Sequence, residues 1–317
     1  MGKKSDQNNN SSAADPWKSK AVQKLYNVVQ KVFDLSTPDD RLIAAAKAKA
    51  EVKKIEAQSQ AEAEAIKLLS KAETAAKAKI VEARGDLAAR ALNRMEGDAI
   101  RQQQNIEAII TEAYVALPPP DQRISDEPVN EDFIHRFFDD SKNISDEQMR
   151  TVWGRLLAGE IAQPGSYHPK TLAVLKDLTK YDAELFVSVC RFAVRFEMLV
   201  PLIFNHMDDV YRNADVNFGA LLHLDDLGLI NFQSLVGFTI LKSSVFTYGT
   251  QEFVVMTPSP DSIPVGQVAF SSCGSQLAQL VDAAIVPEFV NYFTSEWHNR
   301  GVVATPKDSH LALLIAR

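Results

Sequence analysis

The feature that most constrains this chain is a helical pattern that runs from residue 36 to residue 117 with little to interrupt it. After Pro38, the residues that weaken helices most strongly are confined to Gly85 and Gly97. Residues 41–84 are rich in Ala, Glu and Lys and repeat every 11 residues: RLIAAAKAKAE, VKKIEAQSQAE, AEAIKLLSKAE and TAAKAKIVEAR. Because 11 residues fill about three helical turns, such a repeat favours a nearly straight or weakly right-handed supercoil.

Large apolar residues are sparse in this segment, and they recur one period apart. Ile55 and Ile66 form one such pair, and Leu69 and Ile80 form another. Alanine lets helices approach closely, and Glu/Lys pairs four residues apart support the helix in water. We expect residues 36–117 to join copies of the chain into a homo-oligomer through these four side chains, with a solvated single helix as the alternative. The segment from Leu87 onward has more Leu, Ile and Met, which predicts docking on the C-terminal part.

The beginning of the chain combines a polar tail with an amphipathic segment. Residues 1–15 are rich in Asn, Ser and Lys and are expected to be disordered. Residues 16–35 carry apolar and basic side chains on opposite faces at helical spacing. One hypothesis is a helix that lies on an anionic membrane, and the other is an ordinary helix packed on its own chain or on a sister chain. The candidate membrane-binding residues are Trp17, Lys20, Lys24, Leu25, Val28, Val29, Lys31, Val32 and Phe33.

Charge and composition restrict the partners and the compartment. Residues 1–117 contain 19 Lys+Arg and 16 Asp+Glu, a net charge of +3. Residues 118–317 contain 15 Lys+Arg and 25 Asp+Glu, a net charge of −10. The acidic second part disfavours nucleic acid, whose phosphates need clustered positive charge. The longest apolar runs fall short of a membrane span, and no secretory signal pattern is present. Two cysteines do not make a disulfide framework, so we expect a cytoplasmic protein, located peripherally at the inner membrane or an infection-associated membrane if the basic helix binds lipid.

The remaining residues predict a linker followed by a globular domain. Residues 118–132 contain a Pro-rich linker, and residues 133–317 form the expected α+β domain. Ser145 and Gln148 predict a capping box that opens a helix, and a later helix is expected to run from Thr179 to about Asp209. Beyond residue 220, runs such as VGFTILKS and QEFVVMTP predict strands between helices. The predicted fold is therefore mainly α: an amphipathic helix and a long coiled-coil-like helix, followed by an α+β domain with a winged-helix-like end.

The stretch from Trp153 to Phe186 combines buried anchors with turn and cap residues. Trp153 and Leu157 are expected in the core, while Glu160 can accept hydrogen bonds from amides of the following loop. Asp182 can bond back to the amide of the Thr179 cap. These roles predict a helical corner rather than a binding pocket. The structural residues of this corner are Trp153, Leu157, Glu160, Pro164, Gly165, Ser166, Pro169 and Asp182.

No constellation of catalytic or metal-binding residues is evident in the sequence. None of the six histidines has a recognised metal-ligand spacing, and the group of His206, Asp208 and Asp209 is better explained as a helical surface. Cys190 lies in an apolar run, and Cys273 stands alone at a helix start. We expect a non-enzymatic protein with no metal, no cofactor and no catalytic residue.

The same corner also carries a family resemblance. The residues WGRLLAGEIAQPGSYHP and the turn Leu178-Thr179-Lys180-Tyr181-Asp182-Ala183 resemble a group of uncharacterised bacterial proteins with a coil before this domain. They are also similar to the Abi-alpha abortive-infection family. Residues 268–280, VAFSSCGSQLAQL, resemble the element that closes such domains. The resemblance implies a role in bacterial defence against phage, beside a second defence protein.

Three functional hypotheses follow. The first is a non-enzymatic anti-phage sensor or adaptor that oligomerises through its coil and recruits a partner effector. The second is a nucleic-acid-binding regulator that uses the winged-helix-like end, although the expected recognition helix, SSCGSQLAQLVDAA, has no Lys or Arg. The third is an enzyme of unknown type.

Overall fold

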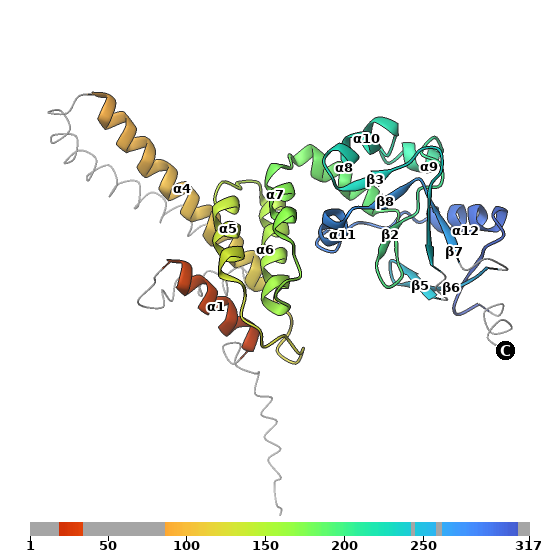
Figure 1. Ribbon diagram of the computed structural model, residues 1–317, viewed down its shortest axis with the longest axis horizontal. Helices are drawn as coiled ribbons and strands as arrows, with labels where there is room; N and C mark the ends of the chain where they lie inside the picture. Colours follow the sequence, from red (N-terminus) through yellow and green to blue (C-terminus); the bar gives the residue numbers. More distant parts are fainter. Residues whose placement is uncertain (1–18, 34–85, 242–244, 258–261, 310–317) are drawn as a thin grey trace, which may run out of the picture. The chain divides into compact units, whose positions relative to one another are not determined.

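The computed structural model describes residues 19–33, 86–241, 245–257 and 262–309. It is a mixed α/β structure with antiparallel sheets, and it divides into two compact units between Ser166 and Tyr167 (Figure 1). This division falls inside the domain predicted for residues 133–317. The predicted oligomerisation residues Ile55, Ile66, Leu69 and Ile80, and also Trp17, lie outside the described residues.

The first unit is built from four described helices. They are α1 (Lys20–Phe33), α4 (Asp86–Ala116), α5 (Glu131–Ser141) and α6 (Glu147–Ala162). The C-terminal half of α4 packs against α6, and buried apolar side chains fill the contact. Trp153 is fully buried, and its ring meets Phe137 edge-on with a centroid distance of 5.2 Å. α4 therefore docks on helices that the sequence assigned to the C-terminal part.

The helix α1 buries the apolar face for which the sequence left two hypotheses, a membrane or the protein itself. Leu25, Val28 and Val29 are buried, because α1 packs against α5 and α6. Phe33 contacts Phe138 of α5 with a ring centroid distance of 5.2 Å. Val32 lines a groove of about 220 Å³ between α1 and α5. This apolar face is thus packed on its own chain, which is the second of the two hypotheses.

The basic face of α1 also contacts its own unit. Lys31 forms an ion pair with Glu131 at 2.8 Å, and Lys20 forms one with Asp126. The ammonium group of Lys24 donates to the Ser125 carbonyl at 3.4 Å. The three lysines predicted to bind lipid headgroups thus contact the segment from residue 125 to residue 131. Among the described parts of the chain, no helix is long and apolar enough to cross a bilayer.

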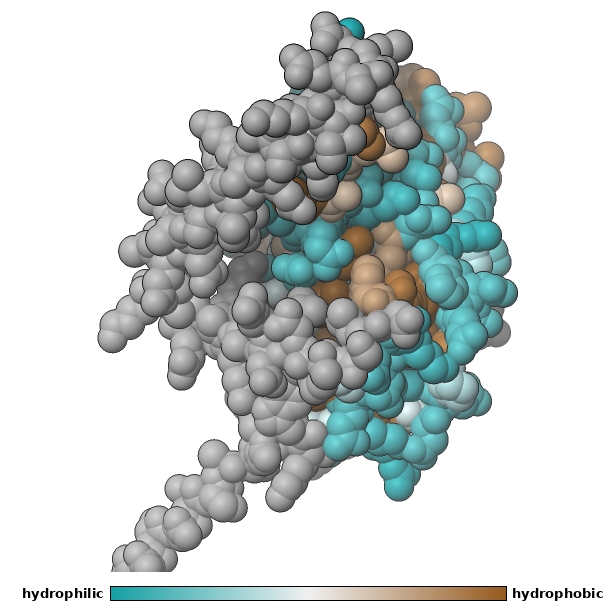
Figure 2. All heavy atoms as spheres, turned by 90° about the vertical axis from the view of Figure 1, so that its left-hand side faces the viewer, coloured by the Kyte–Doolittle hydropathy of each residue, from teal (hydrophilic) through white to brown (hydrophobic). Residues whose placement is uncertain are grey.

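Figure 2 shows the face of the molecule seen from the left of Figure 1. Hydrophobic atoms gather in the middle of this face, and hydrophilic atoms border them on the right and below.

The second unit combines short helices with short strands. Its helices are α7 (Pro169–Asp177), α8 (Lys180–Cys190), α9 (Asp209–Arg212), α10 (Phe218–Asp226), α11 (Ser272–Ala278) and α12 (Phe289–Asn299). Its strands are β1 (Ala193–Arg195), β2 (Leu199–Pro201), β3 (Ile230–Phe232), β4 (Phe238–Leu241), β5 (Val245–Tyr248), β6 (Gln251–Met256), β7 (Ser262–Gly266), β8 (Val268–Phe270) and β9 (Val303–Pro306).

The strands of the described residues form three antiparallel sheets. The largest has the order β2-β1-β5-β6-β9, and two small ladders pair β3 with β8 and β4 with β7. The hairpin β5–β6 lies in the sequence between β4 and β7, the two strands of one ladder, yet it belongs to the large sheet. Helix α12 covers this sheet with aromatic side chains: Phe293 and Trp297 contact the ring of Phe246 at centroid distances of 5.8 and 5.3 Å.

The helix that begins after Thr179 is shorter than the sequence predicts. It ends at Cys190, and residues 193–201 form the hairpin β1–β2 instead of continuing to Asp209. In this hairpin Val194 is buried between the less buried neighbours Ala193 and Arg195. That alternation has the period of a strand, and aromatic and β-branched residues favour the pleated conformation.

The caps of the helical corner are present, with one displaced by a residue. Glu160 is buried and accepts a hydrogen bond from the Gly165 N–H at 2.7 Å. In the second unit, Thr179 and Asp182 form a capping box. The helix α6 is capped by Asp146, whose carboxylate accepts from the Met149 N–H, and not by Ser145. Asp ranks with Ser as a cap, so both positions could start this helix and the packing decides between them.

Asp182 connects the capping box of α8 to His223 of α10, and the ionisation of Asp182 is expected to affect the stability of the protein. Its side chain is 8% exposed and lies 2.6 Å from His223 Nε2. Burial alone would raise the pKa of Asp182, but hydrogen bonds from His223 and Thr179 outweigh burial and hold the pKa below its ordinary value of 3.8. A depressed carboxyl pKa contributes stability above the unfolded value, and this contribution is lost as the pH falls through the folded value.

We therefore expect acid to destabilise the wild-type protein more than the variant Asp182→Asn. Urea unfolding followed by circular dichroism at pH 7 and at about pH 3 measures the difference, since the carboxylate of the unfolded chain is mostly protonated at the lower pH. At pH 7 the variant should lose about 1 kcal/mol, as expected for a weakened cap. The control Asp226→Asn removes an exposed charge from α10 and should keep the wild-type pH profile. An equal acid loss in wild type and Asp182→Asn would contradict the expectation.

Candidate interaction site

Three aromatic rings form a cluster on the surface of the second unit. His206 lies in the loop between β2 and α9, Phe218 opens α10, and Phe232 ends β3. The ring centroids of His206 lie 5.6 Å from Phe218 and 5.5 Å from Phe232, and Phe218 lies 5.6 Å from Phe232. His206 is buried in a loop, which corrects the helical surface predicted for it.

Gln267 fixes the orientation of this cluster. Its Oε1 accepts from the His206 N–H at 3.0 Å and lies 2.8 Å from His206 Nδ1. Its Nε2 donates to the Ser234 carbonyl at 2.7 Å. Because an amide oxygen only accepts, this arrangement assigns the imidazole proton to Nδ1. One glutamine thus ties the His206 loop to the turn between β3 and β4.

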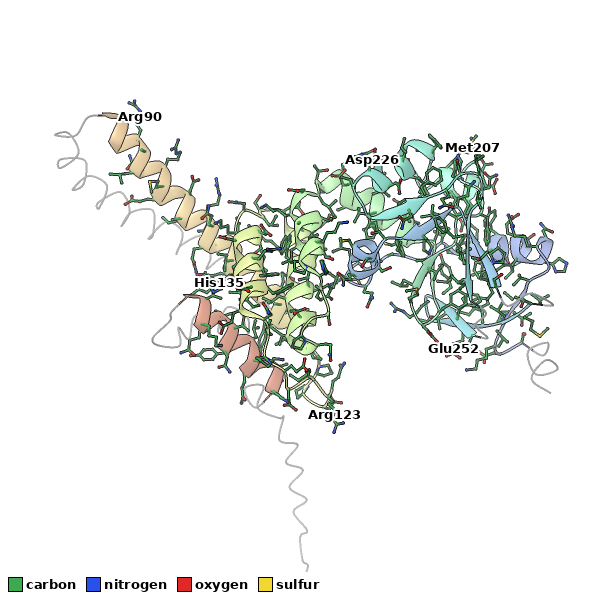
Figure 3. All side chains as sticks on the ribbon, viewed as in Figure 1. Arg90, Arg123, His135, Met207, Asp226 and Glu252 are labelled. Carbon is green, nitrogen blue, oxygen red and sulfur yellow. The ribbon has the colours of Figure 1, made fainter. Side chains whose placement is uncertain are left out.

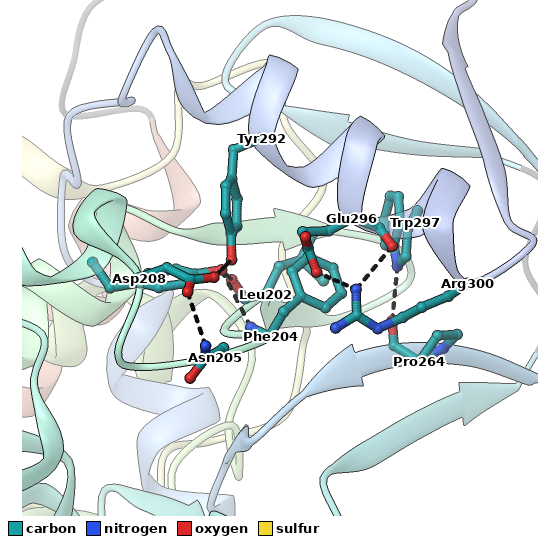
Figure 4. Close-up of polar contacts among 10 residues, drawn as sticks. Leu202, Phe204, Asn205, Asp208, Pro264, Tyr292, Glu296, Trp297 and Arg300 are labelled. Carbon is teal, nitrogen blue, oxygen red and sulfur yellow. Dashed lines mark hydrogen bonds and ion pairs between the residues drawn. The ribbon is translucent and has the colours of Figure 1, made fainter.

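Helix α12 also contacts this loop, through Tyr292 (Figure 4). The Tyr292 hydroxyl donates to Asp208 Oδ2 at 2.5 Å, and Asn205 Nδ2 donates to Asp208 Oδ1 at 2.8 Å. The buried Tyr211 hydroxyl donates to the Leu202 carbonyl at 2.7 Å. Burial, together with the hydrogen bond to Asp208, raises the pKa of Tyr292, so this phenol stays a neutral donor. The loop that carries His206 is therefore held at several points.

Apolar side chains around the cluster are open to solvent. Phe218 is 50% exposed, although it packs on two rings, and Met207 and Leu222 are also exposed. Leu222 follows Phe218 by four residues, so both lie on one face of α10. We call Met207, Phe218 and Leu222 the α10 patch. Exposed apolar groups that are gathered in one place mark interaction surfaces more often than single ones do.

Acidic residues flank the members of the α10 patch in the sequence: Asp208 and Asp209 follow Met207, and Asp225 and Asp226 follow Leu222 by three and four residues. Residues 205–233 contain five aspartates, one arginine and no lysine. Arg212 forms an ion pair with Asp209, which leaves the local charge negative. Figure 3 shows Met207 and Asp226 along the same upper edge of the second unit, at α9 and α10. An apolar centre with an acidic rim is suited to a partner surface that has apolar and basic groups.

The turn between β3 and β4 presents a further apolar pair. Leu235 is 96% exposed, and Val236 beside it is also exposed. The Ser234 carbonyl next to them is held by Gln267, which also holds His206. Gln267 therefore connects the turn that carries this pair to the loop that carries His206.

The two cysteines, which the sequence offers as possible reactive groups, lie in different helices. Cys190 is buried at the end of α8, where burial raises the pKa of its thiol. Cys273 is buried in the first turn of α11, whose cap is Ser271. Within the described ranges, no group of three His, Cys, Asp or Glu side chains could hold a metal ion. The α10 patch was missed from sequence, and the available signal was the pair Phe218 and Leu222 in a helix that begins at an Asn cap.

The described residues define a mixed α/β protein with a helical unit, antiparallel sheets and an exposed apolar patch with an acidic rim. Residues 89–294 match the model of the family described as "Protein of unknown function (DUF2806)". The match covers more than half of the chain, so the chain belongs to the DUF2806 family. Among curated proteins and among solved structures, none matches the chain significantly.

Proposed function

We propose that this protein is a non-enzymatic adaptor of bacterial anti-phage defence that recruits a second protein through the α10 patch. The defence part of the proposal rests on the resemblance of the corner motif and of residues 268–280 to the Abi-alpha family. The recruitment part rests on one observation, which is the exposed apolar and acidic surface around Phe218. No metal, cofactor or catalytic residue is part of the proposal, and its cellular location is the cytoplasm.

The charge of α10 supports a protein partner over a nucleic acid. In the proposed winged-helix-like arrangement, α9 and α10 precede the ladder β3–β8, and the ladder β4–β7 is inserted between its two strands. In this proposal α10 takes the place of the recognition helix, and not the segment 271–284 expected from sequence. Its sequence FGALLHLDD has no Lys or Arg and ends in two aspartates. Such a face lacks the positive charge that phosphate contacts need, whereas it suits a protein surface.

We further propose that copies assemble along α4 and the predicted coil. The buried face of α4, which includes Ile106, Ile110 and Ala113, continues at helical spacing through Leu92 and Met95. Met95 is 64% exposed in the described structure, so this face extends beyond the helices that cover its C-terminal half. Analytical ultracentrifugation tests the assembly, and a monomer at micromolar concentration would reject it. Because α1 is bound to its own unit, it is not part of this proposal as a membrane anchor.

The central test replaces the apolar centre of the patch. Bacteria that express the wild-type gene should show reduced plaque formation by at least one phage in a broad panel. The double variant Phe218→Asp and Leu222→Asp should lose this protection, because two carboxylates would repel a partner that buries apolar groups there. Phe218 also packs on His206 and Phe232, so the double variant should lose some stability. Circular dichroism must therefore show that it is folded at the temperature of the plaque assay.

A matched variant controls for surface mutation in general. Met198, in the turn between β1 and β2, is 58% exposed and lies outside the patch. Met198→Asp should keep full protection. Wild-type protein that protects against no phage would reject the defence role, and a double variant that protects like wild type would reject the patch.

The rival proposal is a nucleic-acid-binding regulator of winged-helix type. Filter binding with duplex DNA at low salt separates the two, because non-specific binding is strongest there. We expect no retention. Retention that Phe218→Asp abolishes would favour the rival.

A further inference from the structure

A second surface feature of the second unit is a small cavity that the patch residues do not line. It has a volume of about 190 Å³ and lies between the ends of β1 and β5 and the segment after α11. Its lining includes Arg191, Arg195, Thr247 and Gln279. Such a volume accommodates one small polar group rather than a drug-sized ligand, whose pockets begin at about 300 Å³.

Strand pairing and backbone hydrogen bonds hold the segments that carry the polar residues of this cavity. Arg195 of β1 lies opposite Thr247 of β5 in the antiparallel ladder, so their positions are set by strand pairing. The Arg191 carbonyl accepts from the Tyr248 hydroxyl at 2.9 Å, and that hydroxyl also accepts from the Val286 N–H at 2.8 Å. Burial, the largest influence, raises the pKa of Tyr248 and keeps it a neutral donor. The Tyr248 hydroxyl thus connects the backbone at Arg191 to the backbone at Val286 in the segment after α11.

The two guanidinium groups retain free donors. Arg191 Nε donates to the Ala284 carbonyl at 3.3 Å, which orients the group and leaves its terminal nitrogens unused in the described structure. No ion pair or hydrogen bond of the Arg195 side chain occurs among the described residues. A guanidinium group presents five N–H donors in a planar fork that matches carboxylate and phosphate oxygens.

The charge of the cavity is opposite to that of its unit. Residues 167–317 contain 10 Lys+Arg and 15 Asp+Glu, a net charge of −5. The lining nevertheless holds two arginines and no acidic side chain, although Asp282 lies between the lining residues Val281 and Ala283. Two cationic residues therefore line one concave site together with a threonine and a glutamine. This combination selects a small anion.

We propose that this cavity binds a small molecule through a phosphate or carboxylate group, with Arg191 and Arg195 as its ligands. Arg195 supplies the fork that faces the anion. Arg191 adds a second charge in an orientation fixed by Ala284. Thr247 and Gln279 provide hydrogen bonds beside them. The site is independent of the proposed defence function, since it shares no residue with the α10 patch.

Thermal unfolding of the full chain in the presence of three probes tests this site. Inorganic phosphate, pyrophosphate and citrate should each be added over a concentration series at constant ionic strength. At least one should raise the unfolding temperature in a saturable manner, because a ligand that binds the folded state stabilises it. Phosphate or pyrophosphate acting alone would identify a phosphoryl ligand, and citrate acting alone would identify a carboxylate.

Variants then assign the effect to the cavity. Arg195→Ala and Arg195→Gln should each weaken the apparent affinity about tenfold or more, as expected for loss of a charged hydrogen-bond donor. The control Arg212→Ala removes an exposed arginine of the same unit that pairs with Asp209, and it should bind like wild type. The proposal is overturned if no probe gives a saturable shift, or if the Arg195 variants respond like wild type or no worse than Arg212→Ala.

Discussion

The variant Gly274→Ala should lose about 3 kcal/mol of the unfolding free energy of the second unit, the largest single effect that we expect. A Cβ atom added at this position would lie 1.8 Å from the Leu229 carbonyl oxygen, far inside the contact distance. That oxygen cannot move freely, because it accepts from the Ser271 N–H at 3.1 Å. The methyl group would therefore push α11 away from the end of α10, and inserted core atoms cost about 1–3 kcal/mol or more.

Urea unfolding followed by circular dichroism measures this loss. The control Gly219→Ala lies in α10, where the nearest atom to an added Cβ is Asn217 Oδ1 at 3.5 Å, an ordinary contact. It should leave stability unchanged or raise it by up to about 1 kcal/mol, because alanine favours helix over glycine. Equal stability of the two variants would show that α11 adjusts without cost.

The variant Gly154→Ala should destabilise the first unit by about 2 kcal/mol. Gly154 lies in α6 at its closest approach to α4, and an added Cβ would lie 2.4 Å from Glu112 Cβ and 2.8 Å from the Ala113 nitrogen. Ala113 is fully buried, so α4 must shift to admit the methyl group. A shift would also loosen the contact between Trp153 and Phe137. The same urea experiment measures the change.

The control for Gly154→Ala is Gly97→Ala, which should raise the unfolding free energy instead of lowering it. Gly97 lies in the exposed half of α4, and nothing lies within 4 Å of an added Cβ. Gly97→Ala should stabilise the helix by about 1 kcal/mol. If both glycine variants shifted the unfolding midpoint in the same direction, packing at Gly154 would not be the cause.

Local signals predicted part of this fold. The capping residues Thr179 and Asp182 and the loop contact of Glu160 follow from side-chain chemistry within a few residues, so they can be inferred from sequence. The amphipathic pattern of residues 16–35 predicts a helix, and the structure has α1 there. The pattern could not say what covers the apolar face, because a membrane and a protein core select the same side chains.

Long-range partners account for what the sequence did not predict. Residues 193–201 have apolar side chains at spacings that suit a helix or a strand, and the partner strand β5 lies some 50 residues later. The candidate interaction site also depends on residues that are far apart in the sequence. Phe218, His206 and Phe232 come from three different elements, and their meeting depends on Gln267 and Tyr292. No spacing in the sequence reveals that meeting.

The position of α12 and β9 has a consequence for how the protein is made. The core of the large sheet is filled by Phe293 and Trp297, and β9 completes the edge beside β6. A ribosome releases the chain from its N-terminus, so α6 emerges long before these elements. The first unit can fold during synthesis, while the second exposes its strands until Pro306 has left the ribosomal tunnel. In that interval the unfinished sheet is the part of the nascent chain that most needs a chaperone.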